Sequence, residues 1–178
     1  MTAPARVLLI GMMGAGKTTT GRLLSQRLGW PYLDSDFEIE RLTGMTVPEI
    51  WKAQGEPAFR AEEAKVLAQA CTSDGPAVVS VAGGAVLDPE NRARIRQAGL
   101  VVWLRADVAT LARRIGAGAG RPLLEGGPAE ALERLYEQRA PIYTELADLV
   151  FDVDRLAPPQ VVDEIVAALK GRDPSSDA

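Results

Sequence analysis

Residues 7–24 read VLLIGMMGAGKTTTGRLL, an apolar run that ends in glycines, a lysine and three threonines before an amphipathic pattern begins. Gly11, Gly16, Lys17 and Thr18 fit the spacing G-x-x-x-x-G-K-[ST], which gathers backbone N–H groups around a phosphate where a strand turns into a helix. Lys17 would contact the β- and γ-phosphates, and the Thr18 hydroxyl would ligate Mg²⁺. The motif therefore predicts a strand, loop and helix that bind a nucleotide.

Two other interpretations of this stretch compete with the first. A plain glycine-rich turn leaves Lys17 without a role. A dinucleotide-binding fold is the second alternative, because Gly14 and Gly16 begin G-x-G-x-x-G and Asp34 follows about 20 residues later. Thr19 stands where the third glycine of that motif belongs, and the lysine–threonine pair has no function in such a fold. The polyphosphate interpretation is therefore favoured.

Five short apolar runs alternate with helical patterns along the chain. They lie at residues 7–11, 31–34, 77–82, 100–105 and 148–153. Because these runs are almost continuously apolar, and long helical segments separate them, they predict a parallel sheet covered on both faces. The expected fold class is α/β, a three-layer P-loop fold with a five-stranded parallel sheet. We expect one domain over 1–171 and a disordered polar tail at 172–178.

Composition limits the partners of the chain. Its 178 residues carry a formal net charge of −4, one cysteine and no histidine. This excludes intrachain disulfides, Cys/His zinc sites and His-dependent catalytic triads. The acidic balance creates no global field for nucleic acid, and no apolar stretch approaches the roughly 18 residues of a membrane span. We therefore expect a cytoplasmic monomer that binds small molecules and has neither nucleic-acid nor membrane partners.

The stretch LDSDFE places Asp34 and Asp36 two residues apart at the end of the second predicted strand. On an extended chain both carboxylates would point the same way, at the edge where ligands bind in parallel sheets. One could hold the magnesium shell and the other a substrate hydroxyl. The structural alternative is that Ser35 or Asp36 simply caps the next helix. The sequence has neither the guanine motif Asn-Lys-x-Asp nor an apolar strand ending in a Walker-B carboxylate.

Further stretches together resemble the shikimate kinase family, whose members transfer the γ-phosphoryl group of ATP to the 3-hydroxyl of shikimate in aromatic amino-acid biosynthesis. The matching pieces occur in the family's order between residues 6 and 170: GMMGAGKTTTGRLL, LDSD, GEPAFRAEE, GGAV, RPLL and QRAPIY. The resemblance implies an ATP-dependent small-molecule kinase with Mg²⁺ as cofactor and with ATP and shikimate as substrates.

The resemblance also implies roles for individual positions. Lys17, Asp36 and Arg121 would be catalytic, whereas Thr18 and, through water, Asp34 would hold the metal. The implied ATP-binding positions are Gly14, Ala15, Gly16, Lys17, Thr18, Thr19, Arg114 and Arg121. The implied substrate-binding positions are Asp36, Arg60, Gly83, Gly84 and Arg139.

By the same resemblance, Arg60 and Arg139 would bind the substrate carboxylate. The residues alone leave the alternative that each is a solvated helix-surface arginine. A carboxylate acceptor in an acidic protein nevertheless needs a local planar cation, and guanidinium binds carboxylate bidentately. Glu63, three residues after Arg60, would hold that guanidinium from the same helix face.

The stretch RRIGAGAGRPLLEGGP predicts a mobile lid over about 115–127. Its glycines supply hinges, and Arg121 lies between them. Closure would exclude the water that would otherwise hydrolyse ATP. The alternative is an ordinary disordered loop, although about a dozen residues without secondary structure is unusual in so small a domain.

Two positions depart from the family's pattern. Ala82 stands where a run of three glycines usually begins, and Leu156 stands where relatives often carry an arginine near the adenine. Arg155 or Pro158 would line that edge instead. Two other functions stay open at this point: a kinase for another small hydroxylated acid such as gluconate, or for a nucleotide, and a P-loop switch module without acceptor-dependent turnover.

Overall fold

The computed structural model describes residues 6–116, 122–124 and 127–171. Five strands form one parallel sheet in the order β2-β3-β1-β4-β5. They are β1 (Arg6–Ile10), β2 (Tyr32–Asp34), β3 (Ala77–Ser80), β4 (Leu100–Arg105) and β5 (Leu149–Asp152). Each strand lies inside its expected run except β1, which begins one residue earlier at Arg6. The prediction of a five-stranded parallel sheet is confirmed.

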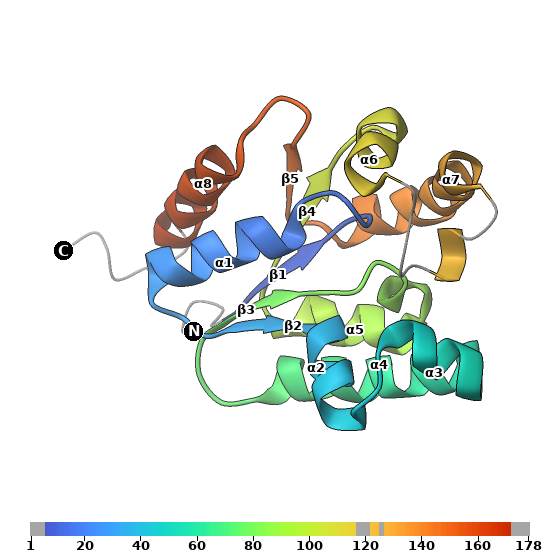
Figure 1. The fold of residues 1–178 in the computed structure, drawn as a ribbon. Helices are drawn as coiled ribbons and strands as arrows, with labels where there is room; N and C mark the ends of the chain where they lie inside the picture. Colours follow the sequence, from blue (N-terminus) through green and yellow to red (C-terminus); the bar gives the residue numbers. More distant parts are fainter. Residues whose placement is uncertain (1–5, 117–121, 125–126, 172–178) are drawn as a thin grey trace.

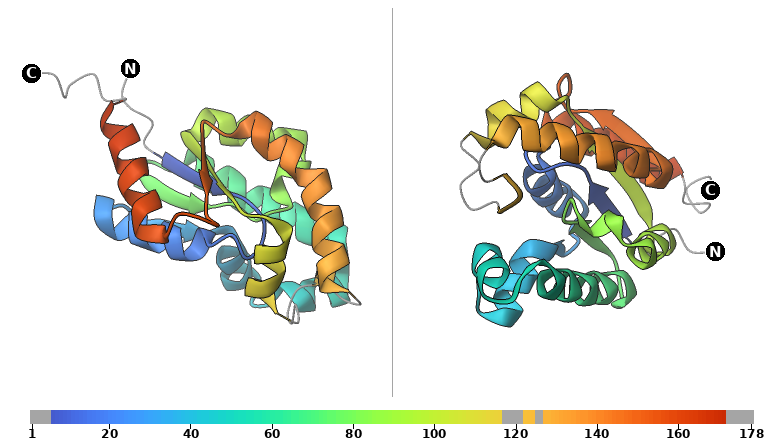
Figure 2. Two further views of the ribbon diagram at one scale, coloured as in Figure 1. Left: turned by 90° about the horizontal axis from the view of Figure 1, so that it is seen from above. Right: turned by 90° about the vertical axis from the view of Figure 1, so that its right-hand side faces the viewer.

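Helices cover both faces of the sheet, as Figures 1 and 2 show. On one face α1 (Lys17–Leu28) packs with α8 (Pro158–Gly171), and on the other lie α5 (Pro89–Ala98) and α7 (Pro128–Leu146). The other described helices are α2 (Ser35–Thr43), α3 (Val47–Gln54), α4 (Glu56–Thr72) and α6 (Val108–Ile115), with 3₁₀ turns η1 (Ala85–Leu87) and η2 (Pro122–Leu124). None of the helices in the described ranges is long and apolar enough to cross a membrane. The predicted three-layer α/β fold is confirmed.

Local sequence signals set several helix ends. Asp88 caps α5 by accepting the backbone N–H of Glu90 at 2.8 Å, ahead of a proline that cannot donate a hydrogen bond. Thr46 and Glu49 form a reciprocal capping box at the start of α3. These caps satisfy N–H groups that a helix start otherwise leaves without partners.

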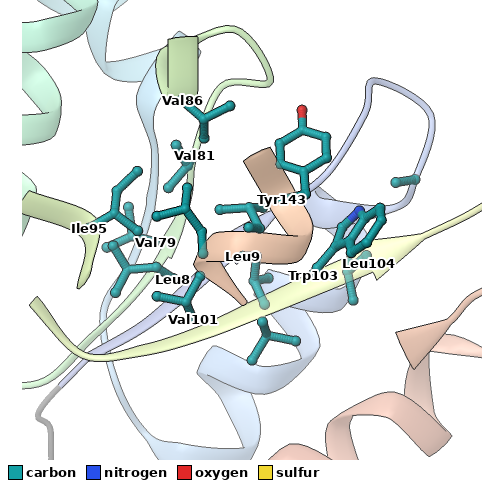
Figure 3. Packing of buried hydrophobic residues seen from close by; sticks show 14 of the residues in the cluster. Leu8, Leu9, Val79, Val81, Val86, Ile95, Val101, Trp103, Leu104 and Tyr143 are labelled. Carbon is teal, nitrogen blue, oxygen red and sulfur yellow. The ribbon is translucent and has the colours of Figure 1, made fainter. Parts of the chain in front are cut away.

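The core divides into two clusters. The larger lies on both faces of the sheet, and Figure 3 shows Leu8 and Leu9 of β1 beside Val101 of β4. The smaller lies between α2, α3 and α4 and consists of the buried side chains of Ile39, Ile50, Phe59 and Val66. The helices from α2 to α4 therefore have an apolar contact surface of their own beside the sheet.

The expected lid at 115–127 is described only in part. Its 3₁₀ turn η2 includes Leu124, which is 1% exposed and packs into the large core. The sequence predicted a stretch without secondary structure, and the turn at Pro122–Leu124 shows that this prediction is wrong for three of its residues. Arg121 and the predicted tail at 172–178 lie outside the described residues, so the mobility of the lid and the disorder of the tail stay predictions.

Gly99 tests how tightly α5 and β4 pack against the start of β1. A Cβ at Gly99 would overlap the backbone carbonyl of Arg6. We expect Gly99→Ala to lower the free energy of unfolding by about 1–3 kcal/mol, the usual cost of overpacking, measured by urea denaturation. Gly171→Ala is the control, because nothing lies within 4 Å of its Cβ position. Equal losses in the two variants would show that Gly99 is not a packing constraint.

Candidate active site

One cavity of about 710 Å³ opens at the edge of the sheet where β1, β2 and β3 end. It gathers predicted site residues that the sequence places far apart. Those that line it are Gly14, Ala15, Gly16, Lys17, Thr18, Thr19, Asp34, Asp36, Arg60, Gly83, Gly84, Arg114 and Arg139. Arg121 lies outside the described residues, so its position at the phosphates stays a prediction. Trp51 and Phe59, with ring centroids 6.0 Å apart, add apolar surface to the wall.

The loop between β1 and α1 has the shape that its motif predicts. Gly11, Gly14 and Gly16 have φ angles of 144°, 82° and 91°, a region that residues with a side chain rarely adopt. Helix α1 begins at Lys17, so the positive end of its dipole borders the cavity. The Lys17 ammonium donates to the carbonyls of Gly11 and Met12 at 2.7 and 3.0 Å. This arrangement suits a bound anion.

The two carboxylate oxygens of Asp34, at the end of β2, accept hydrogen bonds from two different helices. Its Oδ1 accepts the backbone N–H groups of Asp36 and Phe37 at 3.1 and 3.5 Å and so caps α2. Its Oδ2 accepts the Thr18 hydroxyl at 3.2 Å. The cap is therefore Asp34 itself, not Ser35 or Asp36. The expectation that both aspartates share an extended segment is wrong, because the strand ends at Asp34 and Asp36 lies in the first turn of α2.

The oxygen atoms of Thr18 and Asp34 are of the kind that ligates a magnesium ion. No group of three or more His, Cys, Asp or Glu side chains able to hold a metal occurs within the described ranges. Mg²⁺ suits a site with so few protein ligands, because it keeps several waters and completes its shell with substrate phosphates. The Thr18 hydroxyl and the Asp34 carboxylate are the groups available to hold it.

Tyr32 and Ser80 join this group, and no motif in the sequence points to either. The Tyr32 hydroxyl lies 3.1 Å from Asp34 Oδ2 and 2.9 Å from Ser80 Oγ, and the Ser80 hydroxyl also lies 3.2 Å from the Lys17 carbonyl oxygen. Burial raises the pKa of Tyr32, which keeps the hydroxyl protonated as a donor. The register of β2 against β3, which pairs Asp34 with Ser80, is the signal that could have found them.

Arg60 of α4 is held by two carboxylates of its own helix. Its guanidinium contacts Glu56 at 3.3 Å and Glu63 at 2.9 and 3.1 Å. The predicted pairing with Glu63 is confirmed. Gly84 leaves room for this guanidinium, because a Cβ there would overlap it.

Glu63 is a buried carboxyl group on the cavity wall beside Arg60. The residue is 1% exposed. Burial raises the pKa of Glu63 to about 7, and the positive charges of Arg60 and Arg139 limit that rise. Glu63 therefore titrates near neutral pH, so its charge can change while the arginines keep theirs.

Arg139 of α7 is buried as well, which excludes the solvated-surface alternative for this residue. It is 1% exposed, and its Nε is buried without a hydrogen-bond partner. Burial lowers the pKa of Arg139. A buried cation with an unused N–H on the wall of a cavity favours an anionic ligand.

Tyr143 lies one turn after Arg139 on α7, and the sequence analysis gave it no role although it ends the stretch QRAPIY. Its hydroxyl donates to the Gly83 carbonyl at 2.9 Å, and its ring lies beside Trp103, with centroids 5.6 Å apart (Figure 3). The departure at Ala82 leaves the neighbouring backbone fixed, because the Ala82 N–H donates to the buried Ser35 hydroxyl at 2.9 Å. The turn after β3 is thus held from two sides.

Arg114, at the end of α6, connects the P-loop with the loop after β5. It donates to the carbonyl of Gly14 at 3.2 Å and to that of Val153 at 3.0 Å. Arg155 is exposed and does not line the cavity, so of the two expected replacements only Pro158 does. Apolar side chains line this edge of the cavity: Val153, Leu156 and Pro158.

Comparison with known proteins agrees with this geometry. A family model described as shikimate kinase matches residues 13–170. The shikimate kinase of Thioalkalivibrio sulfidiphilus is 45% identical over 166 residues, which cover 93% of this chain and 87% of the relative. The solved shikimate kinase from Acinetobacter baumannii, in complex with shikimate, has a TM-score of 0.90 and 38% identity, covering 96% of this chain and 94% of that one.

A more distant structure shows only the shared fold. A gluconokinase from Sinorhizobium meliloti has a TM-score of 0.59 and 21% identity, covering 95% of this chain and 93% of that one. The family match, by contrast, extends over most of the chain, from the P-loop through α8. This chain belongs to the shikimate kinase family.

Proposed function

We propose that this chain works as a cytoplasmic monomer, one domain over 1–171, that transfers the γ-phosphoryl group of ATP to the 3-hydroxyl of shikimate. The observation that carries the proposal is that one cavity has two chemically different ends, each suited to an anion. A phosphate-binding loop lines one end, and the other has Arg60 and the buried Arg139 with its unused N–H. A phosphorylated donor and an anionic acceptor would meet between them.

The nucleotide half would work through the P-loop. The backbone from Gly14 to Thr19 would bind the phosphates, and Lys17 would exchange its loop carbonyls for the β- and γ-phosphates. Arg114 would lie against the adenine. Thr18 directly, and Asp34 through water, would hold Mg²⁺, which would supply positive charge to offset that of the phosphates.

In the acceptor half, Arg60 and Arg139 would bind the carboxylate of shikimate bidentately, and the backbone at 83–84 would contact the ring. Asp36 would hold the 3-hydroxyl in line with the γ-phosphorus. As the new P–O bond forms and the bond to the ADP oxygen breaks, Asp36 would take the hydroxyl proton. Phosphoryl transfer asks little of a base, so positioning is its main contribution. Arg121 would reach the phosphates when the lid over 115–127 closes.

A panel of acceptors tests the proposed function. ADP release should depend on shikimate and should be negligible with gluconate, with nucleoside monophosphates or without an acceptor. Lys17→Ala should abolish most of this turnover, because it removes a charge-assisted contact worth several kcal/mol in the transition state. Turnover with gluconate instead would favour another small-acid kinase, and slow turnover independent of any acceptor would favour a switch module.

Arg60→Lys tests the carboxylate-binding role. Lysine keeps the charge but loses the planar fork, so the KM for shikimate should rise about tenfold or more while the KM for ATP changes little. Arg94→Lys is the matched control, because Arg94 also pairs with a glutamate one turn away, Glu90, and does not line the cavity. Equal changes in the two KM values would reject Arg60 as the carboxylate ligand.

Glu63 predicts how shikimate binding depends on pH. Below its pKa of about 7 the side chain is neutral, and the charge of Arg60 is available to the substrate carboxylate. Above it the Glu63 carboxylate neutralises part of that charge, so the affinity for shikimate should fall as the pH rises from 6 to 8. Titration calorimetry over this range should show a flatter profile for Glu63→Gln, which keeps the size of the side chain and one acceptor oxygen for Arg60 but does not titrate. Parallel profiles would assign the pH dependence to another group.

A further inference from the structure

A closed circuit of polar contacts joins the first turn of α1 to β2 and β3. Asp34 Oδ2 accepts the hydroxyls of Thr18 and Tyr32 at 3.2 and 3.1 Å. The Ser80 hydroxyl lies 2.9 Å from the Tyr32 oxygen and 3.2 Å from the Lys17 carbonyl oxygen, and its single proton can serve either of them while the Tyr32 proton goes to Asp34. Because Lys17 and Thr18 are neighbours in the chain, their peptide bond closes the circuit. Three segments of the chain are thereby fixed to one another at the metal side of the P-loop.

We propose that the Tyr32 hydroxyl positions the Asp34 carboxylate for magnesium. Tyr32 does not line the cavity, so it would act through Asp34 rather than touch the metal or the nucleotide. The proposal rests on the magnesium site proposed above and adds a residue that neither the P-loop motif nor the aspartate pair identifies.

The orientation of Asp34 supports this role. A carboxylate turns readily about its last side-chain torsion, because that torsion has only a broad preference. Here both oxygens are fixed: Oδ1 by the first N–H groups of α2, and Oδ2 by Thr18 and Tyr32. If the Thr18 oxygen ligated a metal, Tyr32 would remain as a donor to Oδ2. Partners of this kind orient metal ligands and influence metal affinity.

Packing shows that the phenol is held in place and that packing alone does not require its hydroxyl. A Cβ at Gly21, on α1, would overlap the edge of the Tyr32 ring and would come to 3.1 Å from Ser80 Oγ. Glycine inside a helix is unfavourable relative to alanine, so its presence here is explained by the space that the ring occupies. A phenylalanine would fill that space equally well. Packing therefore explains the ring of Tyr32, and the contacts with Asp34 and Ser80 explain its hydroxyl.

Tyr32→Phe tests the proposal through nucleotide binding rather than turnover. ADP affinity is measured by titration calorimetry, once with Mg²⁺ and once with EDTA. We expect the gain in ADP affinity that Mg²⁺ provides to fall about tenfold in the variant, the lower end of the effects of outer partners of metal ligands. The ADP affinity in EDTA and the shikimate affinity should not change. Tyr136→Phe, which removes a hydroxyl from α7 outside the cavity wall, should behave as the wild type.

The possible outcomes distinguish a failure of the role of Tyr32 from a failure of the magnesium site on which it rests. A wild-type protein that binds ADP equally with Mg²⁺ and with EDTA would remove the magnesium site and the role of Tyr32 together. A normal Mg²⁺ gain in both wild type and Tyr32→Phe would leave the site and overturn the role of Tyr32. Equal losses of affinity with Mg²⁺ and with EDTA would also overturn it, because Tyr32 would then shape the P-loop itself. If Tyr32→Phe does not fold, Gly21→Ala displaces the hydroxyl instead and should show the same selective loss.

Discussion

The close approach of β1 to β4 is the constraint on which the site depends. At the end of β1 a Cβ on Gly11 would come to 2.6 Å from the carbonyl oxygen of Leu104, and its φ is 144°. Only glycine meets both conditions, so the chain can leave the sheet there and turn into the P-loop. Because β1 is the central strand, this exit lies between the loop after β5, which Arg114 contacts, and the acceptor side at β2 and β3. The order of the strands thus determines which residues line each end of the cavity.

Charge balance organises the acceptor side. Arg60 and Arg139 form a positive site within an acidic protein, and Glu63 reduces that charge in the absence of ligand. A substrate carboxylate would compete with Glu63 for the same guanidinium, and burial makes Glu63 able to give up its charge near pH 7. The protein can therefore keep the buried Arg139 beside Arg60 without a permanent anionic partner for each.

Much of the fold and of the site could be predicted from the sequence, because the signals are local. Apolar runs predicted all five strands, the P-loop spacing predicted the turn into α1, and the three-residue separation of Arg60 and Glu63 predicted their ion pair. Tyr32 and Ser80, 48 residues apart, could not be predicted, since only the register of β2 against β3 brings them together. The aspartates were located correctly but with the wrong local geometry, because Asp34 ends the strand by capping the next helix. The sequence alone does not distinguish a helix cap from a carboxylate of the site, and here Asp34 has both functions.

The separate apolar cluster between α2, α3 and α4 has a consequence for how such a scaffold can diversify. Its members, Ile39, Ile50, Phe59 and Val66, do not belong to the core that supports the P-loop. Helices α2 to α4 also carry Asp36 and Arg60, which line the cavity and which we propose contact the acceptor. Substitutions that reshape this region can therefore accumulate with little effect on the strands that hold the nucleotide loop. In evolutionary terms, residues 35–66 can vary as a unit, and descendants of one ancestral phosphate-binding frame could change their acceptors largely through this stretch. The end of α4 is more constrained, because Leu67, Ala70 and Cys71 belong to the large core.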